Sequence, residues 1–318
     1  MALPTVKLGS SGLEVTELCL GTLTMSPIQA DMPPDQGGAL IRKAIDEGIT
    51  FIDAAQGYRV YPHMRAGLAG VDRERLVIVT KSHAHTADEM QAAFDDACSE
   101  MAIPYIDIFH LHLLASPEDF DSRTEALDKL KELRDKGLVK AIGVSAHSIA
   151  PFRHVIDHAD IDIFYPTFNQ GGFGINDGTI EEMTLVMQQA VDKGKGTYAM
   201  KPLGGGHLRG DFTGALDFVR GHDCIHAVSI GMKDETELEL NLAYFRGEEI
   251  TDAMKAGIET VDRQLMINGL CKQCGACIKA CEQGALSMGE DKTEVDMEKC
   301  IFCGYCAPEC PVFAIRVI

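Results

Sequence analysis

Eight of the eleven cysteines lie between Cys271 and Cys310, and their spacing constrains the chain more than any other feature. The spacing reads Cys271-x2-Cys274-x2-Cys277-x3-Cys281 and then Cys300-x2-Cys303-x2-Cys306-x3-Cys310, so that one pattern is written twice. A repeat of metal-ligating residues indicates a small domain that folds around two metal centres. Two-residue spacings suit tetrahedral zinc as well as iron–sulfur clusters, so paired zinc sites stand as the alternative.

A fourth cysteine three residues after the third favours clusters, because this run resembles that of bacterial ferredoxins. In that pattern the fourth cysteine of each run binds the cluster of the other run. We therefore expect two [4Fe–4S] clusters. The first is expected on Cys271, Cys274, Cys277 and Cys310, and the second on Cys300, Cys303, Cys306 and Cys281.

One residue of the first run departs from the ferredoxin pattern. Glu282 stands where a proline usually follows the fourth cysteine, as Pro311 does in the second run. A negative charge beside a cluster favours its oxidised form, so we expect the two clusters to differ in reduction potential. The isolated Cys19, Cys98 and Cys224 are expected to be small buried hydrophobic residues.

The residues before the cysteine runs alternate between short apolar stretches and helical patterns, which indicates parallel strands joined by crossover helices. After a hairpin at residues 5–15, eight strands are expected at 17–21, 50–53, 76–80, 106–111, 141–145, 162–166, 197–200 and 227–230. Eight strand–helix repeats in about 250 residues fit a (β/α)8 TIM barrel better than a doubly wound open sheet.

Local signals predict several helix ends and the division of the chain. Thr86 with Glu89 and Ser122 with Glu125 match the capping box, and Gly137 follows a helix. Residues 250–268 are expected to form a last helix. The expected domains are therefore a barrel at 1–268 and a small ferredoxin-like α+β domain at 269–318.

Four ionisable residues lie at or just beyond the C-terminal ends of expected strands, where TIM barrels place their active sites. They are Asp53, Tyr58, Lys81 and His112. Their motifs, GITFIDAAQGY, VTKS and YIDIFHLH, resemble those around the catalytic tetrad of the aldo-keto reductases. Together with the cysteine runs, they make the chain similar to the iron–sulfur branch of that family.

The resemblance implies a carbonyl reductase in which Tyr58 donates a proton to the carbonyl oxygen. Lys81, held by Asp53, is expected to lower the pKa of this phenol, and His112 to orient the carbonyl. Two neighbours compete for these roles. His110 shares a strand face with His112, and Tyr61 lies near Tyr58, but the family positions select His112 and Tyr58. Arg59 replaces the glycine that commonly follows the family tyrosine, so we expect a different loop shape.

The coenzyme contacts that the resemblance implies are only partly present. Ala146, Tyr165 and Met200 replace an asparagine, a glutamine and a tyrosine that commonly hold the nicotinamide, while Gly231 and Glu237 replace basic residues that clamp a 2′-phosphate. NADH is therefore expected to be favoured over NADPH. The candidate contacts are Ser145, Lys201, Gly204, Gly231 and Asn241.

Composition and chemistry define the expected partners. The 48 acidic and 29 basic residues give a formal net charge of −19, which disfavours nucleic acid and anionic lipid surfaces. No leader or membrane span is expected, and reduced thiols suit an anaerobic cytoplasm. Expected partners are a small carbonyl or alcohol substrate and a ferredoxin or other redox protein.

Three functions remain open from the sequence. The first is a nicotinamide-linked oxidoreductase with two clusters for electron transfer. The second is a nicotinamide-independent reductase in which the clusters supply the bound substrate with single electrons, since no motif typical of flavin binding is present to divide a hydride pair. The third is a non-catalytic electron relay.

Overall fold

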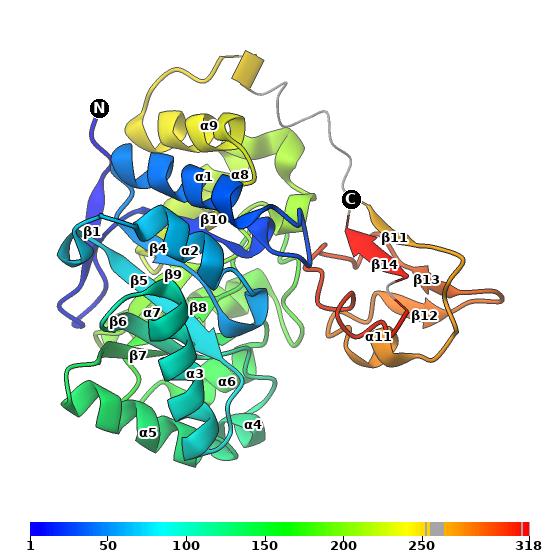
Figure 1. Cartoon of the computed structure of the whole chain (residues 1–318), viewed down its shortest axis with the longest axis horizontal. Coiled ribbons are helices and arrows are strands. Elements are labelled where there is room, and N and C mark those ends of the chain that lie inside the picture. The colour runs from blue at the N-terminus through cyan, green and yellow to red at the C-terminus, as the bar shows by residue number, and fades with distance from the viewer. Residues whose placement is uncertain (252, 255–263, 313, 318) are drawn as a thin grey trace.

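The computed structural model describes residues 1–251, 253–254, 264–312 and 314–317. Eight parallel strands, β3 to β10 in chain order, close into a barrel in which β10 pairs with β3 (Figure 1). The strands are β3 Leu18–Gly21, β4 Phe51–Asp53, β5 Val77–Ser82, β6 Ile106–Leu111, β7 Val139–Ala146, β8 Ile163–Pro166, β9 Gly196–Ala199 and β10 Ala227–Gly231. Their ends lie within two residues of the expected ranges, so the predicted TIM barrel is confirmed.

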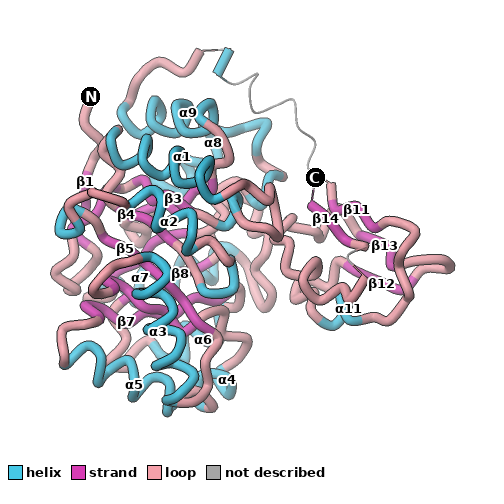
Figure 2. The backbone as a smooth tube through the Cα atoms, in the orientation of Figure 1, coloured by secondary structure: helices cyan, strands magenta, loops and turns pink. Residues whose placement is uncertain are grey.

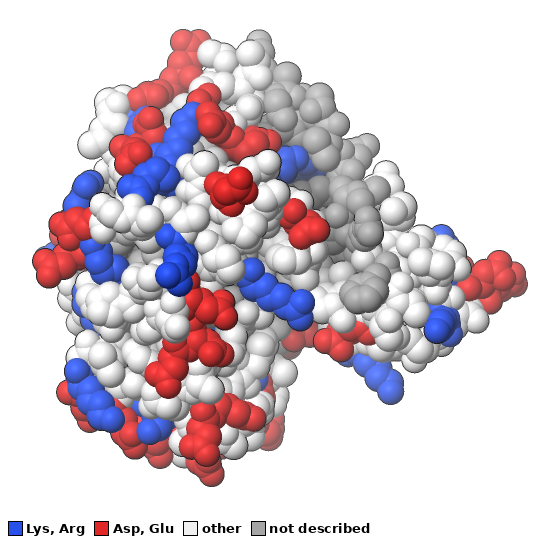
Figure 3. Space-filling view, viewed as in Figure 1, with Lys and Arg blue, Asp and Glu red and all other residues white. Residues whose placement is uncertain are grey.

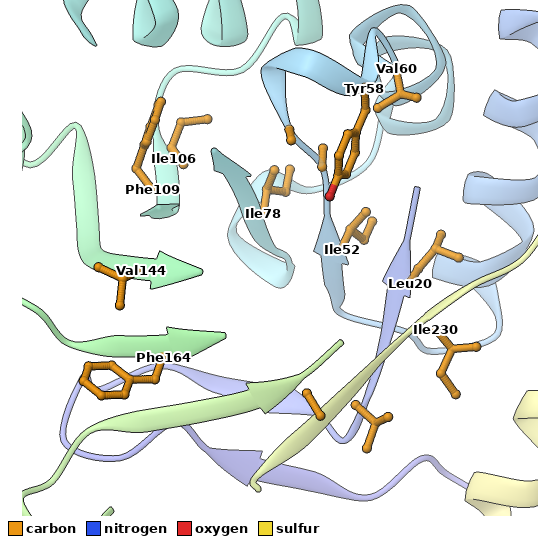
Figure 4. Close-up of a cluster of buried hydrophobic side chains, with 14 of the residues drawn as sticks. Leu20, Ile52, Tyr58, Val60, Ile78, Ile106, Phe109, Val144, Phe164 and Ile230 are labelled. Atoms are coloured by element: carbon orange, nitrogen blue, oxygen red, sulfur yellow. The ribbon is translucent and has the colours of Figure 1, made fainter. Parts of the chain in front are cut away.

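Side-chain alternation along the strands separates the barrel interior from the helix layer. Phe51 and its neighbours in register pack inside the barrel, whereas Leu20, Ile52 and Ile78 pack against the surrounding helices (Figure 4). The predicted hairpin is present as β1 Thr5–Lys7 and β2 Glu14–Thr16. Its side chains join the interior cluster near the start of the strands, which leaves the C-terminal ends of the strands as the open mouth.

Helices surround the barrel, and the residues at their ends show that one of the two predicted capping boxes is wrong. The bounds are α1 Pro34–Asp46, α2 Tyr61–Leu68, α3 Ala87–Met101, α4 Pro117–Asp121, α5 Thr124–Asp135, α6 Ile149–Val155, α7 Ile180–Asp192, α8 Phe212–Arg220 and α9 Glu235–Arg246. Thr86 and Glu89 form the predicted capping box of α3. Ser122 does not cap α5, because it ends the short α4 and its hydroxyl donates to the Asp119 carbonyl at 2.7 Å.

The C-terminal domain consists mostly of loops with short paired strands (Figure 2). Strands β11 Leu265–Ile267 and β14 Ile315–Val317 pair, as do β12 Leu286–Met288 and β13 Thr293–Val295, beside the short helix α11 Ala276–Lys279. The prediction of a last helix at 250–268 is therefore wrong at Leu265–Ile267, which form a strand. Residues 252 and 255–263 of the same prediction lie outside the described residues. Because β11 packs with the cysteine-rich core, we propose a domain boundary just before Leu265.

The distribution of charged side chains and the character of the helices can be compared with the composition. Acidic and basic side chains are scattered among uncharged ones over the displayed face of the barrel (Figure 3). Within the described part of the chain, none of the helices has the length and apolar character needed to cross a membrane.

Candidate active site

Asp53 and Lys81 form a buried ion pair at the mouth of the barrel. The Lys81 ammonium donates to Asp53 Oδ2 and to the Ala54 carbonyl, both at 2.7 Å. The two charged side chains are 2% and 0% exposed, so each charge depends on the other rather than on water. Burial raises the pKa of Asp53 and lowers that of Lys81, and their pairing opposes both shifts.

Lys81→Met is expected to lower the free energy of unfolding by about 3–5 kcal/mol, because it leaves the buried Asp53 carboxylate without its partner. Denaturant unfolding of anaerobically prepared protein measures this loss. The double variant Lys81→Met/Asp53→Asn is the matched control, since it removes both charges and should recover most of the stability. Equal losses in the single and double variants would show that packing, not charge pairing, explains the effect.

Tyr58 lines the cavity that contains Asp53. It ends the 3₁₀ turn Gln56–Tyr58 after β4, and the next residue, Arg59, has a φ of 57°. This left-handed conformation favours glycine, so Arg59 occupies it at some conformational cost. The competing Tyr61 has its hydroxyl 2.7 Å from Thr80 Oγ1 and packs in the helix layer. Of the two tyrosines, the structure brings Tyr58 to the cavity.

The surroundings of Tyr58 keep its phenol protonated. Burial raises the pKa of Tyr58 well above its ordinary value, and Tyr305 and Asp53 raise it further. The Lys81 ammonium lies 5.0 Å from the centre of the Tyr58 ring, but its hydrogen bonds go to Asp53 and Ala54. The expected lowering of the Tyr58 pKa by Lys81 is therefore wrong. A neutral phenol is the form that can donate a proton.

The two candidate histidines have different neighbours. His110 Nε2 lies 2.9 Å from the Tyr198 hydroxyl, which donates to Asp53 Oδ1 at 3.0 Å. The His112 ring is centred 5.8 Å from the Tyr58 ring. Burial lowers the pKa of both histidines well below the ordinary value, so both are neutral at pH 7. The geometry thus brings His112 to Tyr58 and His110 to the ion pair.

Three of the five expected coenzyme contacts line the cavity of about 160 Å³ that contains Tyr58. They are Lys201, Gly231 and Asn241. Ser145 and Gly204 do not line it. The Ser145 hydroxyl accepts the Leu113 N–H at 2.9 Å, and Gly204 packs on the Phe173 ring.

A second cavity lies in the C-terminal domain and is lined by Cys281, Cys300, Cys303 and Cys306. These are the four ligands expected for the second cluster, including the cysteine contributed by the first run. Burial raises the pKa of the Cys306 thiol, and the charges of the neighbouring thiols add to this rise. A cavity walled by four cysteines fits a [4Fe–4S] cluster.

The two cysteine runs also share a backbone conformation. Gln273 and Phe302, which precede the second cysteine of each run, have φ values of 52° and 50°. Their N–H groups bond to the sulfur of the first cysteine, Cys271 at 3.5 Å in one run and Cys300 in the other. Such N–H···S bonds stabilise thiolate ligands and tune cluster potentials.

Among the ligands expected for the first cluster, Cys277 and Cys310 are buried and Cys271 is partly exposed. Cys271 and Cys277 share Thr293 Oγ1, at 3.8 and 3.6 Å from their sulfurs, while Cys274 is exposed. None of the eleven cysteines, all of which lie among the described residues, forms a disulfide. Among the described residues, no three His, Cys, Asp or Glu side chains converge closely enough to hold a single metal ion.

The two cavities share one wall. Ile301, Phe302 and Cys303 line both the barrel cavity and the cluster cavity. Gln29 Nε2 donates to the carbonyls of Phe302 and Cys303, both at 3.4 Å, and His207 Nε2 lies 2.7 Å from the Cys300 carbonyl. An expected cluster ligand is therefore also a wall of the barrel cavity.

Sequence reasoning missed the residues that join the domains. A Cβ on Gly205 would lie 2.2 Å from the Ile301 carbonyl oxygen, so the absence of a side chain at Gly205 lets the cysteine-rich loop approach the barrel closely. Tyr305 packs against the barrel core and bonds to Tyr58. His147 of the barrel contacts Glu282 at 3.2 Å. The one sign of these contacts in the sequence was Glu282, which stands where a proline is usual.

Comparison with known proteins agrees with this architecture. Residues 17–262 match the aldo/keto reductase family, and residues 270–314 match the 4Fe-4S dicluster domain. L-Galactose dehydrogenase of Arabidopsis thaliana is 23% identical over 212 residues, which are 63% of this chain and 66% of the relative. A methylglyoxal reductase of Escherichia coli is 29% identical over 172 residues, or 54% of this chain and 58% of the relative. The chain thus spans between half and two thirds of such relatives.

Solved structures share the fold. An aldo-keto reductase from Bacillus halodurans superposes with a TM-score of 0.63 at 17% identity, covering 81% of this chain and 95% of that one. A Bombyx mori aldo-keto reductase in complex with NADP gives a TM-score of 0.61 at 19% identity, with 81% and 92% covered. At these identities the likeness concerns the fold alone.

Proposed function

The chain belongs to the aldo/keto reductase family, and we propose that it interconverts a carbonyl compound and an alcohol in the barrel cavity, with Tyr58 as proton donor. One observation carries the proposal. Tyr58 lines a cavity at the C-terminal ends of the strands together with Asp53, which holds the buried ammonium of Lys81. That is the arrangement expected for protonating a carbonyl oxygen.

Reduction requires a hydride at the carbonyl carbon and a proton at the oxygen, and the chain's residues serve the second requirement. Tyr58 is neutral and donates its proton as negative charge develops on the oxygen. His112, also neutral, stands beside the Tyr58 ring and can orient the oxygen. Asp53 and Lys81 fix the polar end of the cavity. A nicotinamide coenzyme supplies the hydride when bound.

The cavity offers a dinucleotide some of the contacts it needs. It extends from Tyr58 to Gly231 and Asn241, and the Bombyx mori relative is in complex with NADP. Glu237 also lines the cavity, with its carboxylate accepting the Lys233 N–H at 2.9 Å. Glu237 Oε1 also lies 3.8 Å from the Lys233 ammonium, but its carboxylate offers a 2′-phosphate no hydrogen-bond donor, which supports NADH as the coenzyme.

Equilibrium binding to the anaerobic protein should therefore give a Kd for NADH equal to or lower than that for NADPH. The physical reason is the charge of Glu237 beside the uncharged Gly231. Glu237→Gln should lower the Kd of NADPH more than that of NADH, and Glu239→Gln, on the same helix, is the matched control. A Kd for NADPH tenfold below that for NADH would mean that Arg209 or Lys233 forms a phosphate clamp.

A second candidate function is supported by the shared wall. Cys303 lines both cavities, so a cluster held by Cys281, Cys300, Cys303 and Cys306 would adjoin the substrate site and could supply it with electrons. Iron–sulfur clusters supply electrons one at a time, and two electrons and two protons complete the reduction. The exposed Cys274 offers the first cluster to a ferredoxin or other redox protein.

Deuterium labelling tests the proposal and separates the two electron sources. The intact anaerobic protein is given a panel of aldehydes and ketones with NADH deuterated at C4, or with reduced viologen. Deuterium on the carbinol carbon of the product would support hydride transfer. Solvent hydrogen at that carbon, with turnover by viologen alone, would support the cluster-fed reaction. No alcohol from either donor, in protein with a full complement of iron, would reject carbonyl reduction.

A further inference from the structure

Lys201 is partly buried, and it differs in its partners from Lys81, which is fully buried. It follows β9 with a φ of 56° and lines the barrel cavity. Its ammonium lies 2.8 Å from His147 Nε2 and 3.7 Å from Met200 Sδ. No carboxylate of the described residues lies within 4.0 Å of it. Lys81 has Asp53 as a direct carboxylate partner, whereas the charges of Cys303 and Glu282 act on Lys201 without a direct ion pair.

A chain of side chains from both domains fixes the direction of Lys201. His147 is 3% exposed, and burial followed by the charge of Lys201 lowers the pKa of His147 to about 4. Its ring is neutral, and because Nε2 accepts from the ammonium, Nδ1 carries the proton. That nitrogen lies 3.2 Å from Glu282 Oε2. Glu282, which replaces the usual proline, thus lies within ion-pair distance of the histidine that contacts the Lys201 ammonium.

We propose that Lys201, positioned by His147 and Glu282, binds the carboxylate of an acidic carbonyl substrate. The inference rests on the proposed function, because it names the substrate class of the same site. A partly buried ammonium with no carboxylate of the described residues in contact can form an ion pair with an anionic ligand that enters the cavity. The other charged groups of the cavity are engaged, since Asp53 pairs with Lys81 and both Arg209 and Glu237 have partners.

The remaining walls indicate the rest of the substrate. Many lining side chains are apolar, among them Leu23, Met200, Phe212, Ile230, Ile301 and Phe302. An apolar body with one carboxylate and one carbonyl group satisfies these walls, Lys201 and Tyr58 together. Aryl oxo acids are therefore suitable probes.

Calorimetric titration of the intact cluster-loaded protein tests the proposal without requiring turnover. The probes are phenylglyoxylate, phenylpyruvate and 4-oxo-4-phenylbutanoate, each with its methyl ester. At least one acid should bind about 30-fold or more tightly than its ester, and Lys201→Met should abolish the difference. Lys131→Met, at an exposed ion pair, is the control. Equal affinities of every acid and ester in the wild-type protein would overturn the proposal.

Further variants distinguish a substrate-binding role of Lys201 from a coenzyme-binding or purely structural one. If Lys201→Met weakens NADH binding and leaves acid binding unchanged, the ammonium serves the coenzyme and the proposal fails. Glu282→Gln should raise the Kd of the acid several-fold, leave that of the ester unchanged and keep the iron content. Lys201→Met should not lower the unfolding midpoint of the unliganded protein, in contrast to Lys81→Met. Acid binding that depends on Lys201 but is not followed by reduction would reject the carbonyl-reductase function alone.

Discussion

Replacing Tyr58 by phenylalanine is expected to lower kcat for carbonyl reduction by at least about 10²-fold. The substitution keeps the ring against His112 and removes the one hydroxyl proposed to protonate the substrate oxygen. Because the oxygen gains negative charge only in the transition state, the Kd values of coenzyme and substrate should stay nearly unchanged. Single-turnover kinetics with calorimetric binding measures both quantities.

Tyr61→Phe is the matched control for this substitution. It removes a hydroxyl that is bonded to Thr80 in the helix layer, away from the cavity, and should leave kcat nearly unchanged. If Tyr58→Phe retained most of its activity while Tyr61→Phe lost it, the proton donor would have been assigned to the wrong tyrosine.

Replacing Cys281 by serine should remove the second cluster, although Cys281 belongs to the first cysteine run. Cys281 lines one cavity with Cys300, Cys303 and Cys306, so its loss and the loss of Cys303 should have the same effect. Iron and sulfide are expected to fall from about eight to about four per chain in both variants. Metal analysis and EPR spectra of the reduced protein check this.

The spectra identify which cluster is lost. Cys281→Ser and Cys303→Ser should lose the same EPR signal, while Cys274→Ser should lose the other. Cys98→Ser, outside the cysteine runs, controls for the loss of a thiol. Loss of the Cys274-dependent signal in Cys281→Ser would contradict the crossed ligation, and about two zinc without sulfide would contradict clusters altogether.

The barrel was predictable because its signals are local. Strand residues such as Phe51 and Ile52 are buried on both faces of the sheet, and the resulting short apolar runs appear in the sequence. The capping box of Thr86 is predicted correctly, whereas that of Ser122 is not, because the short α4 begins at Pro117 and uses Ser122 for its end. The strand at Leu265–Ile267 was missed because its partner lies about fifty residues later.

Site residues that belong to a local sequence motif were predictable. Contacts that depend on the packing of the two domains were not. Asp53 and Tyr58 follow one strand in a recognisable motif, and they do line one cavity. The raised pKa of Tyr58 was missed, because it depends on burial and on Tyr305 from the other domain. Glu282 was recognised as a departure from the ferredoxin pattern. Its contact with His147 was not predicted, because His147 lies in a barrel loop that is far from Glu282 in the sequence.

The central claim is that the barrel and the ferredoxin-like domain form one active site, with Cys303 as their shared wall. EPR spectroscopy of the fully reduced protein, recorded with and without a bound cavity ligand, tests it most directly. Benzoate or NADH serves as the ligand, whichever calorimetry shows to bind. Ligand binding should change the signal that Cys303→Ser removes and leave the Cys274-dependent signal unchanged. Two unchanged signals in protein with demonstrated ligand binding would contradict a shared site.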